Sequence, residues 1–144
     1  MSILVSNPIE KRELKNKLGK LFCTLTFDAD KHCNHLTWEG YCNVEDVKIG
    51  LEEGLRLLEE NNCPNMINDS RLSTGPWAGA NEWIITDWSP RAFEQGLRHS
   101  AMIVSSNVFS AMSAQQLQTS YTFAGVDLRT FATREDAASW FQKG

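Results

Sequence analysis

Hydrophobic and polar residues alternate in two stretches near the start of the chain. In residues 21–27 the side chains at every second position are apolar, and residues 36–41 alternate in the same way. A period of two predicts β-strands. The polar residues 28–35 between the two stretches predict a loop, so we expect the strands to form an antiparallel hairpin.

The clearest helical pattern in the chain begins at residue 43. Asn43 is a typical N-cap residue, and Glu45 and Asp46 would lie at the positive end of the helix. Apolar residues then recur at spacings of three and four, namely Val44, Val47, Leu51, Leu55 and Leu58. We expect this helix to end near residue 61, with an acidic opposite face exposed to solvent.

Two compact apolar runs, around Ile67 and Ile103, predict buried strands that each end in polar residues. The other predicted elements are helices over residues 80–96, 114–120 and from Thr133 onward, and a last strand over 126–131. Strands that alternate with helices are joined by crossovers and form a parallel sheet. We therefore expect the strands around Ile67 and Ile103 to lie side by side and to run in the same direction.

The lead-in segment, residues 1–19, contains Asn7-Pro8-Ile9-Glu10, which is typical of a helix start, and Gly19, which is typical of a helix end. A partly extended segment fits the same residues. The whole chain, residues 1–144, is predicted to be a single α/β domain. Its mostly parallel mixed sheet would have about five strands with an N-terminal antiparallel hairpin, and about four helices would pack on it.

The charge and the cysteines narrow the range of partners and locations. The net charge of −4 disfavours a nucleic-acid partner. No apolar run approaches the roughly 18 residues that would cross a bilayer, so we expect no membrane insertion. No CxxC spacing and no cleavable leader accompany the cysteines, which predicts reduced thiols and a cytoplasmic location; they are Cys23, Cys33, Cys42 and Cys63.

Potential metal ligands crowd the predicted hairpin loop, which contains Asp28, Asp30, His32, Cys33 and His35. A metal site needs converging ligands, and no recurrent Cys/His spacing is present. We interpret these residues as an incidental polar loop and predict neither a metal nor a cofactor.

Several short motifs, taken in order, resemble one family. They are Trp38-Glu39-Gly40, Asn68-Asp69-Ser70-Arg71, Trp83, Trp88, Pro90, Arg91, Gly96-Leu97, Phe131, Ala137 and Trp140. Over residues 20–143 the chain resembles the STAS-like superfamily. More narrowly, it is similar to the small stand-alone bacterial proteins called anti-sigma-factor-antagonist-like, which are often grouped with CRAL-TRIO-like domains. The resemblance implies a STAS-like fold and leaves the role open.

In the true antagonists of that superfamily, a serine in an Asp-Ser-Ser-Gly setting is phosphorylated to release a kinase-like partner. The matching region here reads Asp69-Ser70-Arg71, followed by Ser73-Thr74-Gly75, so the resemblance implies Ser70 and Ser73 as candidate phosphorylation sites. The Asp-Ser-Ser-Gly motif itself is absent. Turn formation at the end of a strand is the alternative role for both serines.

Ligands of open sheets collect at the carboxyl ends of parallel strands. There we expect a binding site for a small ligand or a protein partner, formed by Asp69, Ser70, Arg71, Ser105, Ser106 and Asn107, together with Trp83, Trp88 and Arg91 from the following helix. An ion pair of Asp69 with Arg71 or Arg91 that only fixes loops is the alternative. Trp83 and Trp88 lie about 140° apart on an ideal helix, so one should pack inward while the other lines a pocket or a subunit contact.

Three functional hypotheses follow from these features. The first is a non-enzymatic regulatory or binding module. The second is a small-molecule or lipid carrier with an aromatic cleft formed by Trp77, Trp83, Trp88, Phe109 and Phe123. The third is an enzyme that uses Asp69 or His99 as a base, which we disfavour because no positioned partner is evident. A homodimer through the hairpin edge or the aromatic side is a further expectation.

Overall fold

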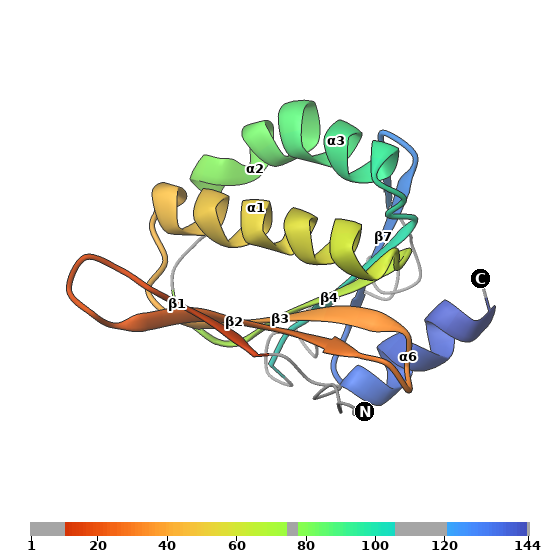
Figure 1. Cartoon of the computed structure of the whole chain (residues 1–144), viewed down its shortest axis with the longest axis horizontal. Coiled ribbons are helices and arrows are strands. Elements are labelled where there is room, and N and C mark those ends of the chain that lie inside the picture. Colours follow the sequence, from red (N-terminus) through yellow and green to blue (C-terminus); the bar gives the residue numbers. More distant parts are fainter. Residues whose placement is uncertain (1–10, 75–77, 106–120, 144) are drawn as a thin grey trace, which may run out of the picture.

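A mixed β-sheet forms the middle layer of the structure, a computed structural model that describes residues 11–74, 78–105 and 121–143 (Figure 1). Within these residues the sheet has seven strands in the order β1-β2-β3-β4-β5-β7-β6. The strands are β1 (Arg12–Lys15), β2 (Leu21–Asp28), β3 (Cys33–Gly40), β4 (Asn65–Ser73), β5 (His99–Ile103), β6 (Tyr121–Phe123) and β7 (Val126–Phe131). Strands β3, β4, β5 and β7 are parallel, whereas β1, β2 and β6 join antiparallel to their neighbours.

Helices cover both faces of the sheet (Figure 1). One face carries α1 (Val44–Asn61) and a helical segment that consists of η1 (Ala78–Ala80), α2 (Asn81–Trp83), the π-helical turn η2 (Ile84–Trp88) and α3 (Ser89–Glu94). The other face carries α6 (Arg134–Lys143). No helix in the described ranges is both long and apolar enough to cross a bilayer.

The predicted α/β class, the antiparallel hairpin and the parallel strands are confirmed. Strands β4 and β5 are parallel neighbours, with Ile67 opposite Ala101 and Asp69 opposite Ile103. The predicted count of about five strands was too low, because β1 and β6 add short antiparallel strands at the two edges. The predicted helix over residues 114–120 lies outside the described residues.

The interpretation of the lead-in segment as a helix is wrong for residues 12–15, which form the edge strand β1. β1 pairs with the open edge of β2, where Arg12 lies opposite Leu25. The Arg12 guanidinium also donates a 3.1 Å hydrogen bond to Glu53 of α1 and contacts Glu60. Backbone pairing and these ion pairs with α1 come from tertiary structure, so the local sequence could not reveal them.

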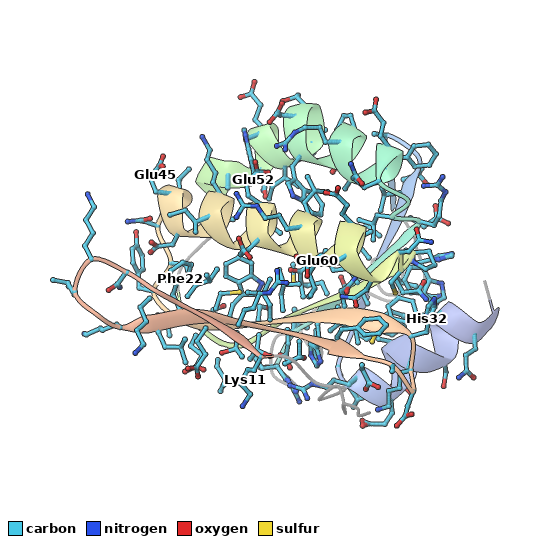
Figure 2. All side chains as sticks on the ribbon, in the orientation of Figure 1. Lys11, Phe22, His32, Glu45, Glu52 and Glu60 are labelled. Atoms are coloured by element: carbon cyan, nitrogen blue, oxygen red, sulfur yellow. The ribbon has the colours of Figure 1, made fainter. Side chains whose placement is uncertain are left out.

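The main core lies between the sheet and α1. Trp38 and Leu36 of β3 and Leu58 of α1 are completely buried there, and Phe22 of β2 lies in the same layer (Figure 2). As the sequence predicts, Asn43 caps α1: its side chain accepts a 2.8 Å hydrogen bond from the Asp46 amide. A smaller core on the other face packs α6 against β4 and β5.

Gly50 allows α1 to approach β3 closely. A Cβ atom at this position would lie 2.3 Å from the ring atom Cη2 of the buried Trp38. Gly50→Ala is therefore expected to lower the free energy of unfolding by about 1–3 kcal/mol, although alanine favours a helix by about 1 kcal/mol. Urea denaturation checks this, with Arg56→Ala on the exposed face of α1 as the control. An unchanged denaturation midpoint for Gly50→Ala would contradict the packing described here.

Candidate functional site

A cavity of about 350 Å³ lies between the sheet and the helical layer formed by α1, α2, η2 and α3. Strands β4, β5 and β7 form its floor, and the helical segments form its roof. The described residues that line it are Asn68, Ser100, Met102, Val126 and Leu128 from the strands and Leu51, Asn81, Ile84, Ile85, Trp88 and Ser89 from the helices. Its size matches that of small-molecule sites.

The π-helical turn η2 shapes the roof of the cavity. Its backbone is widened by one residue, because the Ser89 amide donates to the carbonyl of Ile84, five residues earlier. Such π-turns occur frequently at functional sites. Trp88 fixes η2 to α1: its indole nitrogen donates a 2.9 Å hydrogen bond to the Leu51 carbonyl, and its side chain is buried. Ile85, which is exposed, extends from the lining towards solvent.

Asn68 is the most informative polar residue in the cavity. It is 6% exposed, and its side-chain oxygen Oδ1 accepts a 3.1 Å hydrogen bond from the indole nitrogen of Trp38. An indole nitrogen can only donate, so the oxygen of the Asn68 amide must face Trp38. The amide nitrogen Nδ2 is left without a hydrogen-bond partner among the described residues.

Ser100 is the second buried polar residue on the floor. Its side chain is 4% exposed and makes no hydrogen bond within the described part of the chain. In the parallel ladder Asn68 lies opposite Met102, two residues beyond Ser100, so Asn68 and Ser100 are diagonal neighbours on the same face of the sheet. The floor therefore presents an amide and a hydroxyl among apolar side chains, and the roof adds two further polar residues, Asn81 and Ser89.

α6 packs on the opposite face of the sheet (Figure 1). A separate charged cluster of Asp69, Arg71 and Arg134 lies on that face. The carboxylate of Asp69 is 3% exposed and accepts hydrogen bonds from Arg71 Nε at 2.9 Å and Nη2 at 2.6 Å. Arg134, the first residue of α6, donates to the same carboxylate from Nε and Nη2 at 3.2 and 3.1 Å. Burial would raise the pKa of Asp69, but the hydrogen bonds from Arg71 and Arg134 outweigh it, so the pKa lies below its usual value.

The serines of the predicted rim have structural partners. The Ser70 hydroxyl donates a 2.9 Å hydrogen bond to the Ile103 carbonyl, which ties β4 to β5, and the Ser73 hydroxyl donates to the Ser70 carbonyl at the same distance. Ser105 follows β5 and is half-buried. The remaining two rim residues, Ser106 and Asn107, lie outside the described residues.

The predicted site residues divide between the two faces of the sheet. Asp69 and Arg71 lie on the α6 face, whereas Trp83, Trp88 and Arg91 belong to the helical layer on the other side (Figure 1). Arg91 forms ion pairs with Glu52 at 2.8 Å and Asp87 at 2.9 Å. The alternative Asp69–Arg71 ion pair is therefore present, and the alternative Asp69–Arg91 pair is not.

The two tryptophans differ in burial, but the same residue, Trp88, both packs inward and lines the cavity, and Trp83 is not among the described lining residues. Trp88 is 4% exposed and lines the cavity. Trp83 is half-buried, and the charged ends of Lys48 and Arg91 lie 5.5 and 6.0 Å from the centre of its ring. Of the other aromatic residues proposed for a cleft, Trp77 and Phe109 lie outside the described residues, and the side chain of Phe123 is also outside them.

The candidate bases and metal ligands are held by burial, packing or hydrogen bonds within the fold. Burial, with a contribution from the Arg134 charge, lowers the pKa of His35 to about 4. His99 contacts Asn65 Oδ1 through Nδ1 at 3.2 Å and packs edge-on against Trp140. Cys33 and His35 lie within β3 rather than in the hairpin loop. Within the described ranges, no group of three or more His, Cys, Asp or Glu residues converges as a metal site would require.

The cysteine thiols are all free and buried. Burial raises the pKa of Cys33 to about 12 and that of Cys42 to about 11, and it also raises the pKa values of Cys23 and Cys63. A protonated, shielded thiol is a poor nucleophile.

The thiols should therefore react slowly in the folded protein. At about pH 8, Ellman's reagent is expected to label the native chain far more slowly than a small thiol, and to release all four equivalents once the chain is unfolded in guanidinium. Fast labelling of even one thiol in the native protein would contradict the burial described here.

Three residues of these two sites are not among the predicted site residues. Asn68 was predicted only as part of the polar end of a strand and Ser100 only as part of an apolar run, although polar residues in buried strands are unusual and are the signal for such a site. Arg134 follows the last parallel strand, so the same carboxyl-end argument that selected Arg71 could have selected it.

No family model, no curated protein and no solved structure matches the chain.

Proposed function

We propose that this chain is a non-enzymatic binding module of the STAS-like type that holds a small molecule in the cavity between β4, β5 and β7 and the helical layer. The observation that carries the proposal is the cavity floor, where Asn68 Nδ2 and the Ser100 hydroxyl belong to lining residues and make no hydrogen bond to another described residue. Buried polar groups are normally hydrogen-bonded. A ligand in the cavity could provide hydrogen-bond partners for both groups.

The charged and nucleophilic groups favour binding over catalysis. Asp69 is held as a carboxylate by two arginines, and its lowered pKa makes it a weak base. His99 is engaged by Asn65 and Trp140, and the thiols are buried. These environments support a binding role and weigh against the enzyme hypothesis.

The helical layer is the surface that we expect a protein partner to contact. The edge strands β1 and β6 have only four and three residues, which leaves little backbone for pairing with a second copy at the sheet edge. The roof of the cavity, in contrast, has exposed residues such as Ile85. A regulatory role would follow if the bound molecule shifts η2, and the free, buried cysteines support the proposed cytoplasmic location.

Thermal unfolding in the presence of butylbenzene tests the proposal. This apolar molecule is small enough for the cavity, and a ligand that binds only the folded chain raises its unfolding temperature. Leu128→Phe adds bulk to the cavity wall and is the matched control. We expect a concentration-dependent rise in the unfolding temperature of the wild type and a much smaller rise in the variant. No rise in the wild type, or equal rises in both proteins, would contradict the proposal.

A further inference from the structure

We infer that the ligand of this cavity is an uncharged, largely apolar molecule that carries one hydrogen-bond acceptor, such as a ketone, ester or amide oxygen. The inference rests on the proposed function and adds the chemical class of the ligand. The orientation of the Asn68 amide and the residues that line the cavity carry it.

The cavity offers a hydrogen-bond donor at a fixed place. Trp38 Nε1 donates to Asn68 Oδ1, which fixes the amide so that its oxygen is already used. The two N–H groups of Asn68 Nδ2 are then the groups available to a molecule in the cavity. An amide nitrogen of this kind donates and does not accept, so its natural partner is an acceptor oxygen.

The Ser100 hydroxyl adds a second hydrogen-bonding group to the cavity, and a ligand with an acceptor oxygen remains the preferred one. Its hydroxyl lies on the neighbouring strand, diagonal to Asn68, and it can donate to the same acceptor or accept from a ligand hydroxyl. The pair would therefore favour a carbonyl or an alcohol over a hydrocarbon of the same shape.

The residues that line the cavity disfavour a charged ligand. None of the described residues that line the cavity is Lys, Arg, His, Asp or Glu. An ion that enters an apolar cavity loses its hydration, and without an opposite charge this loss is not compensated. Arg91, a cationic side chain of the helical layer, is already paired with Glu52 and Asp87.

The volume limits the size of the ligand. A cavity of about 350 Å³ lies near the lower end of the range for small-molecule sites, which suits roughly 10–15 non-hydrogen atoms. This size corresponds to a single ring with a short chain.

Three probes with nearly the same skeleton separate the alternatives. Benzylacetone carries a ketone, butylbenzene carries no polar atom, and hydrocinnamate carries a carboxylate. Their dissociation constants for the full chain would be measured by isothermal titration near neutral pH. We expect benzylacetone to bind about threefold to tenfold more tightly than butylbenzene, which is the effect of one neutral hydrogen bond. Hydrocinnamate should bind at least tenfold more weakly than benzylacetone.

Variants of Asn68 link the preference to the proposed donor. Asn68→Leu removes the donor and should abolish the preference for benzylacetone over butylbenzene. Because it also removes the acceptor of Trp38, Asn68→Asp is the second variant: it keeps that acceptor and replaces the N–H groups by oxygen. Leu72→Ala, at an exposed position outside the cavity, should leave all three affinities unchanged.

The outcomes distinguish this inference from the proposed function. Equal affinities for benzylacetone and butylbenzene, or a preference that survives in both Asn68 variants, would overturn the ligand class while the cavity remains a binding site. Tighter binding of hydrocinnamate would overturn it as well. Failure of all three probes to bind would overturn the proposed function itself.

Discussion

Replacing Trp88 by alanine is expected to lower the free energy of unfolding by about 3–5 kcal/mol. Trp88 is 4% exposed, fills the space between η2 and α1, and donates a 2.9 Å hydrogen bond to the Leu51 carbonyl. Truncation removes a large buried apolar surface and enlarges a cavity that is already present. The protein cannot easily collapse into that space, because α1 is fixed by its own packing against Trp38.

Urea denaturation would measure this loss of stability. Two further variants would separate the contribution of Trp88 packing from that of its hydrogen bond and provide a control in the same turn. Trp88→Phe keeps most of the packing and loses the hydrogen bond, so we expect a loss of about 1–2 kcal/mol. Ile85→Ala changes an exposed residue of the same turn and should change stability by roughly 0.5 kcal/mol or less. A loss below about 1 kcal/mol for Trp88→Ala would show that η2 is not anchored as described.

The second large effect is expected for Asp69. Asp69→Ala removes the carboxylate that holds Arg71 and Arg134, and should lower the free energy of unfolding by about 2–4 kcal/mol. We expect less than the full cost of breaking a buried ion pair, because the two arginine side chains are about 40% exposed and can be hydrated. Arg56→Ala, which removes an exposed partner of Glu53 on α1, is the control and should cost roughly 0.5 kcal/mol or less.

The pH dependence of this effect has a definite sign. The pKa of Asp69 is lower in the folded chain than in the unfolded chain, so the folded state is stabilised by its ionised form. This contribution is complete above the usual carboxyl pKa of about 4 and is lost as the pH falls through the lower, folded value. The wild type should therefore lose stability relative to Asp69→Asn between about pH 5 and pH 2. Parallel pH profiles for the two proteins would contradict the ion-pair geometry.

Periodicity was sufficient to predict most of the fold. The strands around Leu25, Leu36, Ile67 and Ile103 and the helix from Val44 were found because each buries a regular set of apolar side chains. The adjacency of β4 and β5 followed from the order of strands and helices. These features depend on local pattern and general topology, which a single sequence contains.

The two edge strands and the site depend on tertiary structure. β1 has four residues, two of them basic, and it forms only because β2 offers an open edge and α1 offers two glutamates to Arg12. The prediction that the strand around Ile67 ends at the polar residues after it is wrong, because β4 continues to Ser73. Within β4, Asn68 and Asp69 are consecutive and point to opposite faces. Asp69 therefore faces α6, while Asn68 faces the cavity.

The cavity itself could not be predicted from the pattern. Its floor is recognisable afterwards, since Asn68 and Ser100 are polar residues in buried strands. Its volume depends on how far the π-helical turn η2 stands from the sheet, and that distance is set by the anchoring of Trp88 on Leu51. The spacing of apolar and polar residues indicates neither the cavity volume nor the distance between η2 and the sheet.

Intermolecular nuclear Overhauser effects between bound benzylacetone and the isotope-labelled full chain would show directly whether the ligand lies between the sheet and the helical layer. We expect contacts from the ligand to both layers at once, to Met102 on the floor and to Leu51 and Trp88 in the roof, and a shift of the Asn68 side-chain amide signal. Contacts confined to exposed residues such as Tyr41 and Leu72, with the Asn68 signal unmoved, would contradict it.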